Sequence, residues 1–210
     1  MGAETSFSGH YASTQRQAYI DHILRQEIPG GGWSLTGDAA DADITGMALQ
    51  ALAGYQAQSK VKAAIERALS WLSKTQNSDG SYSTIGEENC ESTVQVIVAL
   101  CTLGIDLNDS RFVKQGHSVL DGLMSYYVKG SGFTHVKGGG SGADGMSTEQ
   151  GFYALVAVDR AVKGQGSLYA MADADLPQSG DTVRDIQDVL CREVVRMICN
   201  MMQAVGEMRP

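Results

Sequence analysis

The sequence contains no apolar run close to the 18 residues that suggest a membrane-spanning helix, although 43% of its 210 residues are hydrophobic. Residues 1–8 have neither a basic start nor an apolar stretch, so we expect no signal peptide in this chain. No phosphate-binding glycine loop and no Ser/His/Asp nucleophile elbow is present. The chain is nevertheless long enough for one ordinary domain with a hydrophobic core.

Cysteine is sparse, with four residues in two pairs. Cys90 and Cys101 are expected about three turns apart on one helix, and Cys191 and Cys199 about two turns apart on another. Neither pair can therefore form a disulfide within its helix. We interpret all four as free buried thiols, because the chain is neither short nor rich in cysteine. A disulfide framework is the alternative.

Basic residues are almost missing from three glycine-rich windows of the sequence. Residues 29–50, 78–95 and 130–150 hold nine of the 24 acidic residues but one of the 16 basic residues, Lys137. The net charge of −8 therefore resides in these windows, and acids and bases balance elsewhere. An acidic surface of this kind disfavours nucleic acid and anionic membranes as partners.

The same windows carry a repeated pattern of a glycine-rich loop, an aromatic residue and the start of an apolar helix. The aromatic residues, spaced 49 and then 51 residues apart, are Trp33, Tyr82 and Phe133. When the units are aligned on a closing Ala-Leu pair, one position is shared by Thr45, Thr93 and Thr148. A period near 50 residues indicates a repeat architecture.

Apolar periodicity predicts six helices of two alternating kinds in the repeat region. The predicted inner helices, of which the second is apolar nearly all round, span about residues 43–56, 91–103 and 147–162. The predicted outer, amphipathic helices span about residues 14–26, 61–72 and 109–127. This alternation predicts an all-α fold with an inner barrel of helices inside an outer ring.

Residues 181–207 form a further predicted helix that does not continue the repeat. Its wide apolar stripe includes several methionines, which we interpret as core residues, with a partner-binding surface as the alternative. The helix must dock on its own domain or on a neighbour, and we expect a homodimer. The predicted division is a repeat domain at residues 1–170, then a connector and amphipathic helix at residues 171–210.

Four stretches carry a family resemblance: Gly31–Trp33, Asp41–Leu52, Glu91–Leu100 and Ser147–Ala157. They resemble the prenyltransferase and squalene-oxidase repeat of α/α toroids, in the superfamily of terpenoid cyclases and protein prenyltransferases. Within this superfamily, the pattern of the four stretches is most similar to that of bacterial cell-surface repeat proteins and cobalamin-carrier-like toroids. The resemblance implies an extracellular or surface location. It also implies a partial toroid, because such rings have about six hairpins and this chain has about three.

One possible catalytic motif is Asp41-Ala-Asp43-Ile44, which resembles the Asp-x-Asp-Asp acid of terpene cyclases. That chemistry requires a carboxylic acid that neighbouring groups keep protonated, so that it can protonate an alkene. Ile44 occupies the last position, which leaves the motif incomplete. We therefore interpret the two aspartates as helix caps, with the catalytic acid as the alternative.

A second possible site is the set Glu88, Cys90 and His135, which resembles the zinc ligands of protein prenyltransferases. We expect no metal and no other cofactor, because Glu replaces Asp and His135 lies in a glycine-rich loop. Glu88, Cys90 and His135 are therefore kept as the runner-up prediction for a metal site.

Residues 145–150 resemble the thioester motif of complement domains, but Ser147 stands where the cysteine would be, so no thioester can form. Residues 92–95 and 147–150 read as Ser-x-x-Gln capping boxes.

The region where the three loops converge is the predicted ligand face, which we call the mouth. We predict a non-catalytic ligand-binding or interaction module of a secreted or surface bacterial protein, with a small apolar or cationic ligand. The alternative is a prenyltransferase-like or cyclase-like enzyme whose site is incomplete in this chain, with a missing N-terminal half of the toroid as partner. The candidate mouth residues are Trp33, Asp41, Asp43, Thr45, Tyr82, Glu91, Thr93, Phe133, Thr148 and Glu149.

Overall fold

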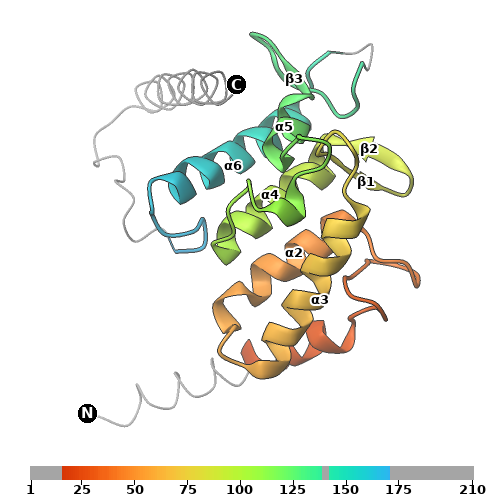
Figure 1. Ribbon diagram of the computed structural model, residues 1–210, viewed down its shortest axis with the longest axis vertical. Coiled ribbons are helices and arrows are strands. Elements are labelled where there is room, and N and C mark those ends of the chain that lie inside the picture. The colour runs from red at the N-terminus through yellow and green to blue at the C-terminus, as the bar shows by residue number, and fades with distance from the viewer. Residues whose placement is uncertain (1–15, 139–141, 171–210) are drawn as a thin grey trace.

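The computed structural model describes residues 16–138 and 142–170. Its centre is a row of three helices: α2 (Ala42–Leu52), α4 (Cys90–Leu103) and α6 (Gly145–Val162). The middle helix α4 packs against α2 on one side and α6 on the other (Figure 1). These are the predicted inner helices, and each begins within two residues of its predicted start.

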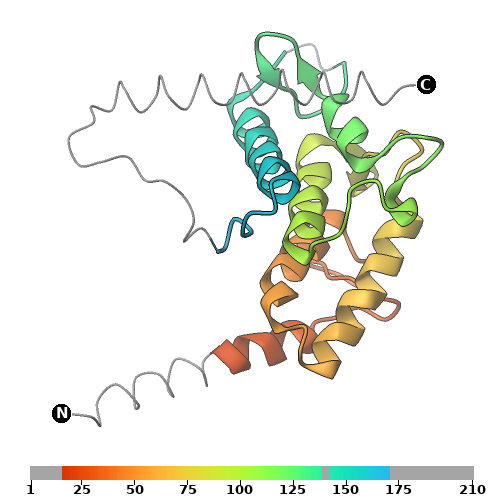
Figure 2. The same ribbon diagram turned by 60° about the vertical axis from the view of Figure 1, so that its left-hand side comes forward.

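A second set of helices covers the outer side of this row, as Figure 2 shows most clearly. A helix at residues 16–25 and α3 (Ser59–Thr75) lie beside α2, and the short α5 (Val119–Met124) packs on α4. Two single 3₁₀ turns, η1 (Ala53–Tyr55) and η2 (Ser110–Phe112), precede α3 and α5. The first two predicted outer helices are therefore confirmed.

The third predicted outer helix, residues 109–127, is wrong as a single element. The chain makes a tight turn in which Lys114 pairs with His117, and the two residues between them, Gln115 and Gly116, both have positive φ angles. Such a turn reverses the chain and cannot belong to a right-handed helix. A new helix, α5, then starts at a capping box in which Ser118 and Asp121 bind each other's backbone amides.

Two short antiparallel hairpins are further elements that the apolar pattern did not predict. The strands β1 (Tyr82–Thr84) and β2 (Glu87–Asn89) pair so that Tyr82 lies opposite Asn89, the residue before α4. The strands β3 (Tyr127–Val128) and β4 (Gly132–Phe133) form the second hairpin. The described chain is thus mostly helical with a small amount of strand, not purely helical.

The shared threonines hold the three aromatic residues against the inner helices. Each threonine Oγ1 accepts a hydrogen bond from an aromatic residue's backbone N–H, at 2.9 Å for Trp33–Thr45, 3.1 Å for Tyr82–Thr93 and 3.0 Å for Phe133–Thr148. The contact is close: at Gly132, which has φ of 132°, a Cβ atom would lie 2.3 Å from the Thr148 hydroxyl oxygen. The three units therefore share one contact as well as one sequence pattern.

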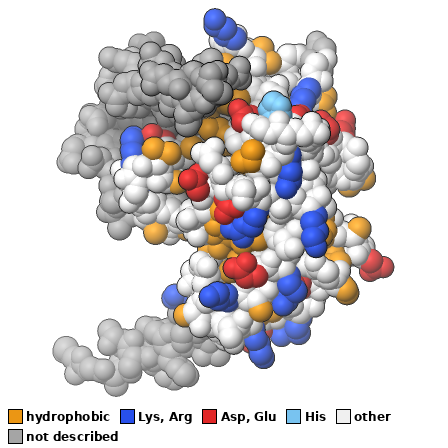
Figure 3. Space-filling view, in the orientation of Figure 1, with side chains coloured by type: hydrophobic (Ala, Val, Ile, Leu, Met, Phe, Trp, Pro, Cys, Tyr) orange, Lys and Arg blue, Asp and Glu red, His pale blue; other side chains and the backbone are white. Residues whose placement is uncertain are grey.

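The hydrophobic core surrounds α4. Every residue from Cys90 to Leu100 is buried except Gln95, so this helix is enclosed by its neighbours. Basic side chains predominate on the lower half of the surface in Figure 3, where α3 and the helix at residues 16–25 lie. Within the described residues, no helix combines the length and apolarity needed to cross a bilayer.

The predicted helix at residues 181–207 lies outside the described residues, as do Cys191 and Cys199. The predicted homodimer, the division at residue 170 and the extracellular location therefore stay predictions. Cys90 and Cys101, which the structure does describe, are free thiols.

We expect Thr93→Val to lower the free energy of unfolding by about 1–3 kcal/mol, because the change leaves the buried Tyr82 N–H without an acceptor. Thr93→Ser keeps the hydroxyl and is the matched control, so its loss should be smaller. Urea unfolding of the three proteins measures both values. Equal stability of the valine variant and the native chain would show that the threonine contact is dispensable.

Candidate functional site

The three inner helices share one partly exposed face, which we call the inner face. Three positions of each helix form this face: the residue two before the shared threonine, the residue two after it and the residue five after it. These positions are four and three residues apart, so their side chains lie on one side of the helix. In the order α2, α4, α6, the upper row of this face is Asp43, Glu91 and Met146. The middle row is Met47, Gln95 and Gln150. The lower row is Gln50, Val98 and Tyr153.

The upper row lies at the N-terminal ends of all three helices, and contacts between neighbouring helices fix their register. The Ser147 hydroxyl donates to Glu91 Oε1 at 2.6 Å, which joins the first turns of α4 and α6. The charge of Glu91 also acts on the Asp43 carboxyl in the first turn of α2. The structure thus places Asp43 and Glu91 together on this face, with Asp41 just before α2 and the exposed Glu149 on the first turns of α6.

The caps of the three helices correct one sequence-based prediction. Asp41, Asn89 and Asp144 are the N-caps, and each side chain accepts a hydrogen bond from the backbone N–H three residues later at 2.8 Å. The predicted capping boxes at Ser92 and Ser147 are therefore wrong, because these serines are the donors in the first turn. Their hydroxyls bind other side chains instead, Thr84 in the case of Ser92.

Asp43 is the least satisfied polar group of the inner face. It caps nothing, it is half-buried, and its Oδ1 is buried without a hydrogen-bond partner among the described residues. Burial raises the pKa of this carboxyl, and the negative charges of Asp41 and Glu91 raise it further. Nearby Ser92 and Thr84 hydroxyls partly oppose the rise in pKa. A bound proton or a nearby cation would therefore stabilise the Asp43 carboxyl.

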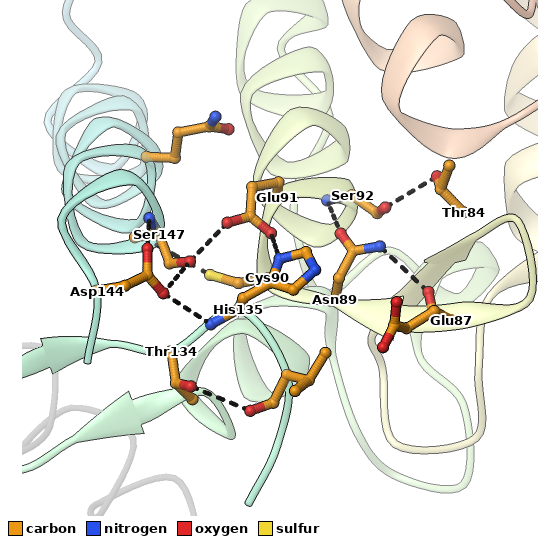
Figure 4. A network of polar contacts seen from close by, with 12 residues as sticks. Thr84, Glu87, Asn89, Cys90, Glu91, Ser92, Thr134, His135, Asp144 and Ser147 are labelled. Carbon is orange, nitrogen blue, oxygen red and sulfur yellow. Dashed lines mark hydrogen bonds and ion pairs between the residues drawn. The ribbon is translucent and has the colours of Figure 1, made fainter. Parts of the chain in front are cut away.

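A cluster of polar side chains joins α4, α6 and the loop between them (Figure 4). The His135 ring lies with Nδ1 2.7 Å from Glu91 Oε2, and its backbone N–H donates to Asp144 Oδ2 at 3.1 Å. The Glu91 contact raises the pKa of His135. The Ser147 backbone N–H donates to Asp144 Oδ1 at 2.8 Å, and this hydrogen bond is the largest cause of the lowered pKa of Asp144. The Glu91 contact therefore favours the protonated form of the His135 ring.

This arrangement is not a nucleophilic triad. The Ser147 hydroxyl is fully buried and contacts two carboxylates, Glu91 Oε1 at 2.6 Å and Asp144 Oδ2 at 2.7 Å. A triad requires an imidazole next to the hydroxyl to take its proton, and here His135 contacts Glu91 instead. The cluster connects the helices and does not activate the serine.

The runner-up zinc ligands are not assembled in the structure. Glu88 pairs with Lys137 Nζ at 3.0 Å, and His135 contacts Glu91. The Cys90 thiol is buried beside the Ser147 carbonyl, and burial raises its pKa to about 12. Residues 16–138 and 142–170 contain no group of three His, Cys, Asp or Glu side chains placed to hold a metal ion. Lys137 also binds Asp79, so part of the negative charge of the loops is neutralised.

The three aromatic residues among the candidate mouth residues lie behind the inner face. The rings of Trp33, Tyr82 and Phe133 are buried. The Trp33 Nε1–H donates to the Ile23 carbonyl at 2.7 Å, and the Tyr82 hydroxyl donates to the Leu72 carbonyl at 3.1 Å. These rings therefore attach the outer helices to the inner ones. The threonines that bind the backbones of these aromatic residues have the same structural role.

Sequence reasoning missed a belt of hydrogen bonds across the middle and lower rows. Gln50 Nε2 donates to the Gln95 main-chain oxygen at 3.1 Å and to Gln95 Oε1 at 3.0 Å, and Gln95 Nε2 donates to Gln150 Oε1 at 3.3 Å. The Tyr169 hydroxyl donates to Gln50 Oε1 at 2.6 Å and contacts the Tyr153 hydroxyl at 3.0 Å. The spacing from the shared threonines would have pointed to Gln95 and Gln150. No signal marked Tyr169, which follows the last predicted inner helix.

The chain matches a known family over more than half of its length. Residues 3–126 match the squalene-hopene cyclase C-terminal domain, so the chain belongs to this family. The match confirms the resemblance to the terpenoid cyclase and prenyltransferase-like α/α-toroid superfamily. It includes α2 to α5 and ends before α6. No curated protein matches the chain.

We expect Glu91→Gln to lower the pKa of His135 toward the ordinary value of 6.5, because the Glu91 contact is the main cause of the rise. NMR titration of the His135 ring measures this directly. A raised pKa in the folded state means that the pair stabilises the fold fully below pH 6.5 and loses this contribution as pH rises through the folded pKa. His135→Gln should therefore cost more stability at pH 5.5 than at pH 8.5. An unchanged His135 pKa in the Glu91 variant would refute the assignment.

We expect Asp43→Asn to stabilise the fold at pH 7. Because the pKa of Asp43 is raised in the folded state, the charged carboxylate destabilises the fold above that pKa, and the effect vanishes below 3.8. The gain should therefore shrink as pH falls toward 3.8. Asp41→Ala is the contrasting variant and should lose about 1 kcal/mol with its cap. Thermal unfolding from pH 3 to pH 8 tests both, and a less stable Asp43→Asn protein at pH 7 would contradict the account.

Proposed function

We propose that this chain is part of an α/α toroid and acts as a non-catalytic binding module, with the inner face as its ligand site. The equivalent threonine contacts and the alternation of inner and outer helices support the toroid. The observation that carries the binding function is the buried, unpartnered Oδ1 of Asp43. A buried carboxylate oxygen without a hydrogen-bond partner is costly, so a ligand that supplies a donor to Oδ1 is favoured.

The ligand that fits this face is an alkylammonium ion, with a positive charge at one end and an apolar body. An N–H donor with a positive charge satisfies the Asp43 oxygen and the negative potential of Glu91 together. Met47 and Met146, at 52% and 59% exposure, offer apolar contact at the two sides of the face. The glutamines of the middle row supply polar contacts between them. Neutral apolar molecules lack the interaction with Asp43 and should bind more weakly.

The second candidate function is an acid-initiated cyclisation, which the family match and the raised pKa of Asp43 favour. Two observations count against it. Ile44 interrupts the acid motif, and Gln95, Gln150 and the exposed methionines would place nucleophilic oxygen and sulfur atoms beside a carbocation. Cyclisation requires a site that protects such reactive intermediates. Incubation with squalene, the molecule in the family name, followed by mass spectrometry of the extract, tests this reading.

We expect octylammonium to bind the native chain in a calorimetric titration, and to bind Asp43→Asn about tenfold more weakly, because one charge-assisted hydrogen bond is lost. Protons compete with the ligand for Asp43, so affinity should fall as pH is lowered through the raised pKa of that carboxyl. Glu149→Gln removes an exposed acid that is outside the three rows and is the matched control.

Equal affinity of the native chain and the Asp43→Asn variant would refute the cation site. A cyclised product from squalene that disappears in the same variant would instead establish the second candidate function.

A further inference from the structure

The chain folds back over the inner face after α6, through residues 164–170, which we call the strap. Gly164 has φ of 66°, and at Gly166 a Cβ atom would lie 2.3 Å from the Ala170 carbonyl oxygen, so the strap is a compact turn that requires glycine. Arg160 Nε donates to the Gly166 carbonyl at 2.7 Å. Figures 1 and 2 show this segment, in blue, turning back at the end of α6. The base of the strap is therefore fixed to α6.

The tip of the strap closes the lower row of the inner face. The Tyr169 hydroxyl contacts both Gln50 on α2 and Tyr153 on α6. These residues occupy the same position in the first and third units, and the second unit has the buried Val98 there. The hydroxyl thus bridges the face across α4, whereas the upper and middle rows have no such cover from the strap.

The direction of these hydrogen bonds is fixed by one main-chain atom. Gln50 Nε2 donates to the Gln95 carbonyl oxygen, which can only accept, so the amide of Gln50 cannot be flipped. Its Oε1 therefore faces Tyr169 and needs a donor. A phenol has one proton, which Tyr169 gives to Gln50, so Tyr153 must donate to Tyr169.

The two partners in this contact differ in burial. Tyr169 is 62% exposed, so its ring gains little from burial and the hydroxyl is its main attachment at the tip. Gln50 is 7% exposed in the closed arrangement, so its Oε1 loses the tyrosine donor when Tyr169 leaves and needs a replacement donor from a ligand or from water. Leu168 also packs against the core at the tip, so a ligand that donates to Oε1 lowers the cost of opening but is not the sole determinant of it.

We propose that Tyr169 is a latch, and that a ligand on the inner face displaces it by donating its own hydrogen bond to Gln50 Oε1. This inference rests on the proposed function and specifies the ligand further. The upper and lower rows are seven residues apart, which is about 10 Å at 1.5 Å per residue. The preferred ligand has an ammonium group for Asp43, an apolar spacer of that length and a hydroxyl or amine donor at its far end.

The test compares two probes that differ in one hydroxyl group, octylamine and 8-amino-1-octanol. Hydrogen exchange is measured on the full-length native chain, on Tyr169→Phe and on the control Tyr19→Phe, which also removes an exposed tyrosine hydroxyl. Without a probe, Tyr169→Phe should speed exchange about tenfold at the amide of Ala170, which donates to the Ser167 carbonyl at the tip of the closed strap, and should leave the amide of Gln165 at its fixed base unchanged. The α4 amides and the Tyr19→Phe protein should be unchanged. In the native chain, the amino alcohol should speed strap exchange and octylamine should not.

Binding gives the second readout. The amino alcohol should bind Tyr169→Phe about tenfold more tightly than the native chain, because no tyrosine hydroxyl competes for Gln50. Identical strap exchange in the native and Tyr169→Phe proteins would overturn the latch. An open strap with no gain in affinity for the amino alcohol would overturn ligand displacement and leave the strap a structural element. If neither amine binds any of the three proteins, the proposed function fails, and the exchange result without probes still decides whether the hydroxyl holds the strap.

Discussion

The arrangement depends on a threonine hydroxyl that accepts the backbone N–H of an aromatic residue at the start of each inner helix. This bond fixes where the glycine-rich loop meets the helix, and the loop in turn places an aspartate or asparagine in position to cap it. In the first two units the aromatic side chain then donates a hydrogen bond to an outer helix, whereas Phe133 of the third unit packs against Tyr127 and Phe152. One hydroxyl per unit thereby sets the position of a loop, two helices and a cap.

This constraint also produces the electrostatics of the site. Because the three helices start at the same level, their positive ends lie together near the upper row, and several acidic side chains of the caps, first turns and loops gather there. Most of these carboxylates have partners: Asp144 binds amides and Ser147, Glu91 binds His135 and Ser147, and Asp79 and Glu88 share Lys137. Asp43 is different because Asp41 already caps α2. Its carboxyl keeps Oδ1 buried and without a hydrogen-bond partner among the described residues, and we propose that a ligand satisfies this atom.

The features that repeat along the chain could be predicted from the sequence. The shared threonines and the spacing of apolar residues located all three inner helices and identified the family. Features that do not repeat were missed: the turn at Gln115 and Gly116 is local, and the strands are too short to show alternation. The capping serines were misassigned because Asn89 and Asp144, three residues earlier, are equally good caps, and the pattern alone cannot choose between them. Local sequence patterns also do not show tertiary contacts. These contacts bury Trp33, Tyr82 and Phe133, and they bring Tyr169 to Gln50, which is 119 positions away in the sequence.

The central claim is that Asp43 holds an unsatisfied carboxyl that a cationic ligand completes. The most direct measurement is a carbon-13 NMR titration of the Asp43 carboxyl, with and without saturating octylammonium. The account predicts a pKa above 3.8 in the free protein and a lower pKa in the presence of the ammonium ion, while the pKa of Asp144 stays where it was. A pKa of Asp43 that does not change when the ammonium ion is added would contradict the account.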